Sequence, residues 1–247
     1  MISLTKILLS AVLITGAGYS IAKPHLTVKV TTSEIVDRHL SGFNAVNVAG
    51  PFDVDIKQGA TESVKVEAPP DVMDRILTEV NGGVLKIYSK HEMWNWGNFW
   101  GHHKKILVHV TIKDVNSINI SGSGDVSFRE GISANSLKLR ISGSGDMTGK
   151  VAVKTLESSI SGSGDMKLSG NAASSTVSVV GSGDFTGRDL LTVNTAVRVS
   201  GSGDASVNAS DRVDAAVNGS GDVRYTGAAK NINSRKNGSG DISRGRD

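Results

Sequence analysis

Apolar and polar residues alternate along most of the chain, and the alternation is clearest in the second half. It is organised around a recurring Gly-Ser-Gly-Asp motif. Mostly apolar residues stand seven and five positions before each Asp, with a mostly polar residue between them, and an apolar residue follows every Asp. Because a period of two places successive side chains on opposite faces of a strand, the pattern predicts one strand entering each motif and another leaving it.

The motif occurs seven times at a nearly constant period. Successive motif aspartates are 18 to 21 residues apart. This period is too short for a helix-pair repeat and favours a β-solenoid with about three short faces per coil, stacked in parallel about 4.8 Å apart. Parallel β connections are nearly always right-handed. We therefore expect an all-β fold, a right-handed parallel β-helix whose seven repeating coils run from residue 118 to 247.

The last copy of the repeat is more polar than the others. Ser234, Lys236 and Arg244 stand where most other copies have apolar residues. A terminal coil meets water instead of another coil, and a polar edge resists pairing with other chains. The sequence thus predicts that the stack ends here.

The Gly-Ser-Gly-Asp motif has two interpretations. As a structural corner, its glycines allow positive φ and its Ser and Asp side chains bond to nearby backbone N–H groups. As a calcium site, its carboxylates would form a ladder. Neighbouring carboxylates about 5 Å apart repel by roughly 0.8 kcal/mol in water, so such a ladder needs solvent, N–H donors or cations. One Asp per coil is a small ligand set for Ca²⁺, which takes six to eight oxygens, so the corner is favoured. The candidate calcium ligands are Asp125, Asp146, Asp165, Asp184, Asp204, Asp222 and Asp241.

The first half shows the same alternation in shorter segments. A short helix is expected from Asp71, with Val72, Ile76, Leu77 and Val80 on one side and Asn81-Gly82-Gly83 at its end. No linker separates the halves, so residues 41–247 are expected to form a single domain after a lead-in segment, 23–40. The expected strands lie at 46–48, 52–56, 64–66, 85–87 and 106–112.

An aromatic segment, residues 93–103, contains all three tryptophans of the chain. It lies between two expected strands, which suggests a hairpin with a long tip. Aromatic rings with a polar edge suit sugar rings or a protein partner, and the alternative is a loop that packs on the solenoid. The candidate ligand-binding residues are Trp94, Trp96, Phe99 and Trp100. His91, His102 and His103 are weaker candidates for a metal site, because adjacent histidines on a strand point in different directions.

Residues 1–22 have the pattern of a secretory signal peptide. Lys6 precedes an apolar run from Ile7 to Ile14, and Ser20-Ile21-Ala22 fits a small-x-small cleavage site. The apolar run is shorter than the roughly 20 residues that span a bilayer, so we expect cleavage and export to the periplasm, the cell surface or the medium, with no transmembrane segment in the mature form.

Composition removes several classes of function. The absence of Cys excludes disulfides and thiol catalysis. The formal net charge of +3, with both signs interspersed, gives no case for nucleic acid binding.

The chain resembles the head GIN domain family of autotransporter adhesins, which are exported bacterial proteins. The resemblance covers roughly Ser41 to the C-terminus and implies a parallel β-helix. It supplies no catalytic or ligand-binding residues to carry over. The residues on which the resemblance rests are Gly42-Phe43-Asn44-Ala45-Val46, Gly50-Pro51-Phe52-Asp53-Val54, Lys57-Gln58-Gly59, Gly82-Gly83-Val84-Leu85-Lys86-Ile87 and the Ser-Gly-Ser-Gly-Asp coils.

These observations favour a non-enzymatic binding or structural module of the cell envelope, adhesive or glycan-binding, with a glycan or a cell-surface protein as partner and no cofactor. One alternative is a polysaccharide-active β-helix enzyme, which needs a coil where two carboxylates or a base converge. The aspartates are instead evenly distributed, and no Gly-x-Ser-x-Gly or His-Glu-x-x-His motif is present, so no catalytic residues are expected. The other alternative is a calcium-stabilised scaffold.

Overall fold

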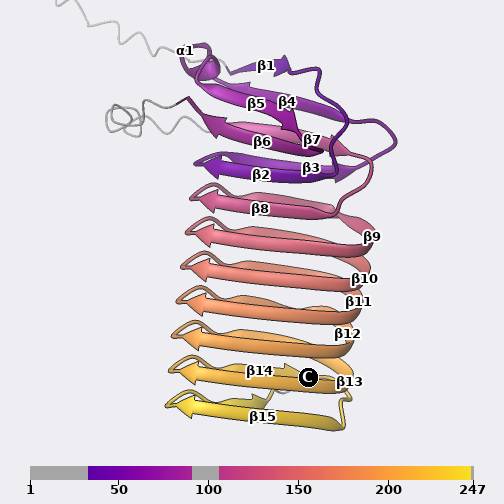
Figure 1. Cartoon of the computed structure of the whole chain (residues 1–247), viewed down its shortest axis with the longest axis vertical. Coiled ribbons are helices and arrows are strands. Elements are labelled where there is room, and N and C mark those ends of the chain that lie inside the picture. The colour runs from indigo at the N-terminus through magenta and orange to yellow at the C-terminus, as the bar shows by residue number, and fades with distance from the viewer. Residues whose placement is uncertain (1–32, 91–105, 246–247) are drawn as a thin grey trace, which may run out of the picture. The chain divides into compact units, whose positions relative to one another are not determined.

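A computed structural model describes residues 33–90 and 106–245 of the 247-residue chain, and these described residues belong to one compact unit. The fold is the expected parallel β-helix, wound right-handed, with its coils stacked along one axis (Figure 1). The described part is nearly all strand, with one short helix, α1 (Pro70–Met73).

Most of the repeating coils are single long strands that bend around the axis. Between β9 and β10 the parallel register joins three separate segments: 126–128 with 147–149, 132–134 with 151–153, and 136–143 with 155–162. This agrees with the expected three faces, although one face is much longer than the other two. We call the outward side of the longest segments the long face. The strands of this region are β8 (Ser117–Gly122), β9 (Val126–Gly143), β10 (Met147–Gly162), β11 (Met166–Gly181), β12 (Phe185–Gly201), β13 (Ala205–Gly219), β14 (Val223–Thr226), β15 (Asn231–Gly238) and β16 (Ile242–Arg244).

The core is filled by columns of inward side chains that match large residues with small ones. Phe128 is fully buried, and in the next coil Gly149 pairs with it in register. A Cβ on Gly149 would lie 1.9 Å from the Phe128 ring. This contact explains why the third position after the Asp alternates between large apolar residues and glycine over the first five copies of the repeat.

The first half also forms coils, but these do not follow the order of the sequence. The coil of β2 (Ala45–Gly50) and β3 (Asp53–Gln58) lies between the β6–β7 coil and the β8–β9 coil: β2 pairs in parallel with β6 and β8, and β3 with β7 and β9. Antiparallel strands cover this end of the stack, where β4 pairs with β1 and β7, and β5 pairs with β6 (Figure 1). The remaining strands are β1 (Glu34–Asp37), β4 (Ser63–Ala68), β5 (Ile76–Asn81), β6 (Val84–Ser89) and β7 (Leu107–Ile112).

Two expectations for the first half are wrong. The helix ends at Met73, and Ile76–Asn81 is strand β5, because Ile76, Thr78 and Val80 also alternate and the segment pairs with β6 across a two-glycine turn. Antiparallel pairing over six residues overrides a helical pattern that a short segment cannot sustain alone. The expected hairpin between β6 and β7 is also absent, since these strands do not pair with each other and belong to successive faces of one coil.

The polar terminal coil is confirmed. All eight residues of β15 are exposed, and β15 pairs only with β13 among the described strands.

Candidate functional surfaces

Both glycines of each motif are required by close contact between coils. The first glycine has positive φ, +130° at Gly162 and +122° at Gly181. At the second glycine, a Cβ on Gly183 would lie 2.1 Å from the carbonyl oxygen of Gly164 in the preceding coil. The corner backbones therefore stack at a distance that excludes any side chain.

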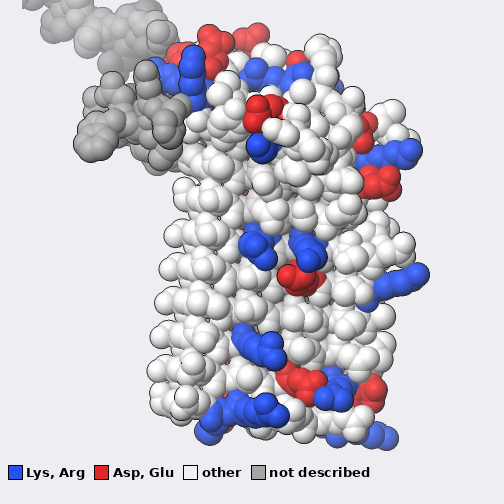
Figure 2. All heavy atoms as spheres, viewed as in Figure 1, with Lys and Arg blue, Asp and Glu red and all other residues white. Residues whose placement is uncertain are grey.

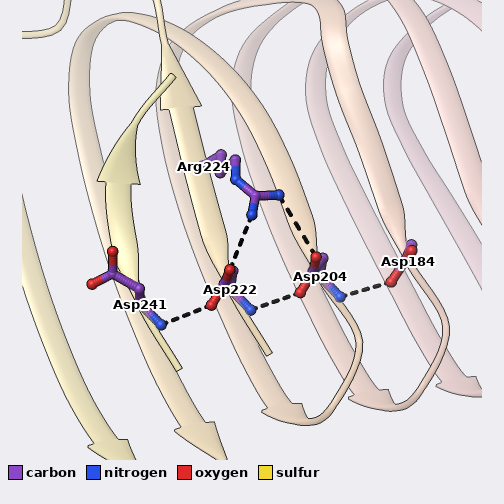
Figure 3. A network of polar contacts seen from close by, with 5 residues as sticks. All are labelled: Asp184, Asp204, Asp222, Arg224 and Asp241. Atoms are coloured by element: carbon purple, nitrogen blue, oxygen red, sulfur yellow. Dashed lines mark hydrogen bonds and ion pairs between the residues drawn. The ribbon is translucent and has the colours of Figure 1, made fainter. Parts of the chain in front are cut away.

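The motif aspartates form a hydrogen-bonded line that we call the aspartate ladder. The backbone N–H of each Asp donates to Oδ1 of the Asp in the preceding coil, at 2.7 to 2.9 Å from Asp146 to Asp241 (Figure 3). Each Asp carbonyl also accepts the N–H of the residue that follows the preceding Asp, as in Val126 to Asp146 at 2.8 Å. One side chain per coil thus ties the corner to its neighbour.

The ladder begins one coil earlier than the repeated motif. The N–H of Asp125 donates to Oδ1 of Asp53 at 3.4 Å, and Gly50 pairs in register with Gly122. Sequence reasoning missed Asp53 because Pro51 and Phe52 replace the Ser and the second Gly. The available signal was the preserved spacing of Gly50 and Asp53, together with the strands on either side.

Cations offset part of the carboxylate charge at the C-terminal end of the ladder. Arg224 lies 3.0 Å from Asp222 and 3.7 Å from Asp204, and its guanidinium spans two rungs (Figure 3). Lys236 lies 3.8 Å from Asp241, the last rung. These contacts reduce the repulsion between stacked carboxylates where the stack ends.

The structure distributes the candidate calcium ligands along the stack. Each coil supplies one carboxylate, and one oxygen of each rung but the last accepts an N–H from the next coil. Within residues 33–90 and 106–245, no group of three or more Asp, Glu or His residues is arranged to hold a metal ion. Calcium binding by the ladder stays a prediction.

The aromatic candidates fall outside the described residues. Trp94, Trp96, Phe99 and Trp100, together with His91, His102 and His103, belong to residues 91–105, which connect β6 to β7. Their proposed role in binding also stays a prediction.

The long face carries a straight column of outward side chains in register, one from each coil. We call it the central column. Cationic side chains in it are separated by small or polar ones. Figure 2, which views this side, shows blue groups, some of them beside red ones, with white surface between them. From the β6 coil to the last coil its members are Lys86, Asn47, Asn119, Arg140, Ser159, Ser178, Arg198, Ala216 and Arg235.

A hollow of about 220 Å³ lies in the central column at the last three coils. Its floor includes Ala216, which pairs in register with Arg198 on one side and Arg235 on the other. The short Ala side chain between two long ones produces the hollow. Its lining is completed by Ala196, Val197, Asp214, Ala215 and Asn233.

The carboxylate beside this hollow, Asp214, is already hydrogen-bonded to neighbouring side chains. Asp214 accepts two hydrogen bonds from Arg212, at 2.7 and 3.0 Å, and a third from Asn233 at 3.2 Å. The hydrogen bond from Arg212 chiefly holds the pKa of Asp214 below its ordinary value, with smaller contributions from Asn233 and from the charges of Arg212 and Arg235. Asp214 is therefore ionised at neutral pH, with its charge offset by Arg212.

A larger hollow of about 720 Å³ lies where β12 bulges out of register between Thr186 and Leu191. Leu191 is exposed in its lining, and Arg188 and Asp189 carry opposite charges there. The other cation of the lining, Arg244, donates to the carbonyl of Gly227 at 2.6 Å. The lining of this hollow thus combines an exposed apolar residue with charges of both signs, and the Arg244 guanidinium is held against the backbone.

Comparisons with known proteins agree with this architecture. A family model described as "Putative auto-transporter adhesin, head GIN domain" matches residues 42–229. A crystal structure of a "putative adhesin" from Bacteroides fragilis superposes with a TM-score of 0.80 at 22% identity, covering 86% of this chain and 97% of that one. A "putative lipid binding protein" and a "putative adhesin" from Parabacteroides distasonis give TM-scores of 0.70 and 0.69, each at 22% identity, covering 87% of this chain and 97% and 98% of theirs. Curated protein sequences give no match.

At these identities the solved structures establish the fold. As for membranes, none of the helices among the described residues is long and apolar enough to cross one.

Proposed function

The chain belongs to the head GIN domain family of auto-transporter adhesins, and from this premise we propose that it is a non-enzymatic, exported binding module of the cell envelope. Its partner is a glycan displayed on a surface. The signal peptide expected in residues 1–22 would deliver it to the envelope.

The observation that carries this proposal is the central column of the long face. Parallel register places one outward side chain per coil on a straight line, at intervals of about 4.8 Å. A surface that repeats at constant spacing suits a partner that also repeats along a line, as a polysaccharide does. The stack is rigid because its ladder and core bind every coil to its neighbours, so little order has to be gained on binding.

The aromatic segment would add a second kind of contact. Trp94, Trp96, Phe99 and Trp100 offer the rings on which sugars stack. Their segment joins strands β6 and β7, whose coil lies next to the β2–β3 coil, on the side away from β8. Stacking on aromatic rings would supply affinity for neutral sugars, which the charged central column does not.

The test is a glycan array probed with the purified chain and with the triple variant Trp94→Ala, Trp96→Ala and Trp100→Ala. We expect the chain to bind a subset of glycans and the variant to lose the neutral ones. A Trp94→Phe, Trp96→Phe and Trp100→Phe variant keeps the rings and is the matched control. Lipid strips run in parallel would detect a lipid partner. No binding to any glycan would contradict the proposal, and depolymerisation of a polysaccharide by the pure chain would replace it with an enzyme.

A further inference from the structure

The hollow on the long face is lined by two guanidinium groups that lack partners. Within the described residues, neither Arg198 nor Arg235 takes part in a hydrogen bond or an ion pair, although both side chains are exposed beside a hollow. Lys138, by contrast, lies 3.0 Å from Glu157 on the same face. Two unpaired cations are thus held on one line at the edges of one depression.

The spacing of these groups is set by the backbone. Arg198, Ala216 and Arg235 are consecutive in the parallel register, so the two arginines leave the sheet about 10 Å apart, twice the distance between coils. Ala216 between them is too short to fill the gap. A group that enters the hollow can therefore reach both guanidinium groups at once. Each planar guanidinium can donate two parallel N–H hydrogen bonds, which matches the geometry of the oxygens of a carboxylate or sulfate.

The nearest carboxylate does not cancel this field. Asp214 is held by two hydrogen bonds from Arg212 and one from Asn233, so its charge is directed to Arg212. The lining therefore holds two guanidinium groups against one carboxylate, which is hydrogen-bonded to Arg212 and interacts only more weakly with Arg235. An anion entering from solvent meets a surface of net positive potential with a small apolar floor formed by Ala196 and Ala216.

We propose that the hollow between Arg198 and Arg235 is a binding site for the carboxylate or sulfate group of an acidic polysaccharide. This site rests on its own residues and is independent of the aromatic segment. It extends the proposed function by assigning a charged class of glycan to the long face.

The rest of the central column favours a polysaccharide over a denser polyanion. Arg140 is a third cation on the same line, three coils away from Arg198, and Ser159 and Ser178 between them present hydroxyls that can bond sugar hydroxyls. A chain with occasional charges and many hydroxyls fits this alternation.

The experiment measures binding of hyaluronan oligosaccharide, which carries a carboxylate on every second sugar, and of kappa-carrageenan oligosaccharide, which carries a sulfate on every second sugar, by calorimetry with the full chain. Dextran is the neutral comparison and polyglutamate the acidic polypeptide comparison. The variants are Arg198→Ala with Arg235→Ala, and Ala216→Gln, which fills the hollow without changing charge. Lys65→Ala with Lys113→Ala removes the same charge from two exposed residues elsewhere and is the matched control.

We expect one of the two acidic oligosaccharides to bind, and the tighter one identifies the anionic group. The arginine double variant should weaken binding by about tenfold or more, Ala216→Gln by about threefold, and the lysine control by less than about twofold. All the substituted side chains point outward, so circular dichroism melts should be unchanged. The proposal is overturned if neither oligosaccharide binds, or if the arginine and lysine variants lose affinity equally. It is equally overturned if polyglutamate binds as tightly and loses affinity in the same variants, which would assign the site to an acidic protein.

Failure here leaves the proposed function standing, because the array also reports neutral glycans bound through the aromatic segment. Conversely, loss of neutral binding in the tryptophan variant leaves the anionic site untouched. The two readouts therefore fail separately.

Discussion

The two ends of the β-helix are built by different rules. Beyond the β8 coil, each coil stacks on the one before it in sequence, with partners 17 to 21 residues apart. In the first half, the coil of β2 and β3 lies between two coils that come later in the chain, and Asn47 bonds Asn119 across 72 residues at 2.7 Å. The repeating coils can thus form by pairing with segments that are close in the sequence. The β2–β3 coil can pair on both sides only after the later β6–β7 and β8–β9 coils have formed.

The difference is visible at a single corner. The repeating corners use Gly-Ser-Gly-Asp, and the second Gly admits no side chain because the preceding coil is in contact. The equivalent corner of the first half, Gly50 to Asp53, has Phe52 at that position, and its side chain is fully buried. The same backbone path is therefore stabilised by close backbone stacking in one region and by an aromatic core residue in the other.

The strongest test of this comparison makes the first corner resemble the others. Phe52→Gly restores the motif glycine but removes a fully buried ring, and we expect it to lower the free energy of unfolding by about 4 kcal/mol or more. Urea denaturation measures this, with Pro51→Ala as the neighbouring control. A loss below about 1 kcal/mol would show that the two corners are interchangeable.

The converse change places a side chain in a repeating corner. Gly183→Ala would bring a Cβ to 2.1 Å from the carbonyl oxygen of Gly164. Because the φ of Gly183 lies outside the left-handed region, the cost comes from the contact alone, and we expect about 3 kcal/mol of destabilisation in urea. Ser182→Ala, at the exposed position next to it, should change stability by less than about 0.5 kcal/mol. Equal stability of the two variants would mean that the coils can separate without cost.

The ladder predicts a smaller effect that depends on position. Asp184→Ala removes the acceptor of the Asp204 N–H at 2.7 Å and should cost about 1 kcal/mol. Asp184→Asn keeps an acceptor oxygen and removes a charge from a line of like charges, so it should be close to neutral. Asp241→Ala should also cost little, since no described N–H donates to that carboxylate. Thermal melts of the three variants check the order, and an equal loss for Asp184 and Asp241 would refute the ladder as a source of stability.

The smallest expected effect concerns calcium. Each rung presents one carboxylate, and no described group of three acidic or histidine residues is arranged to hold a metal, so millimolar Ca²⁺ should shift the melting temperature by less than about 1 °C. Melts with calcium and with a chelator measure this. A rise of several degrees that disappears in Asp165→Asn would instead support a calcium-stabilised scaffold.

Sequence reasoning reached the repeat, the strands around it and the polar last coil because each of these is a local pattern. It placed a helix where β5 lies, since six residues can satisfy a helical and a strand pattern together and only pairing with β6 decides between them. It also missed Asp53, because a corner with different residues cannot be aligned until the coils are stacked. The hollow at Ala216 was visible in the sequence only as a small residue in a polar column.

The sequence by itself determined a right-handed solenoid of about 19-residue coils, because seven copies of a four-residue corner leave little freedom in the backbone between them. Only the tertiary structure decided the order of the first coils, the beginning of the aspartate ladder and the isolation of Arg198 and Arg235 on one line. The physical reason is that a repeat fixes neighbours along the chain through local contacts. Pairings across more than 70 residues, and gaps between side chains on different coils, exist only after the stack has formed.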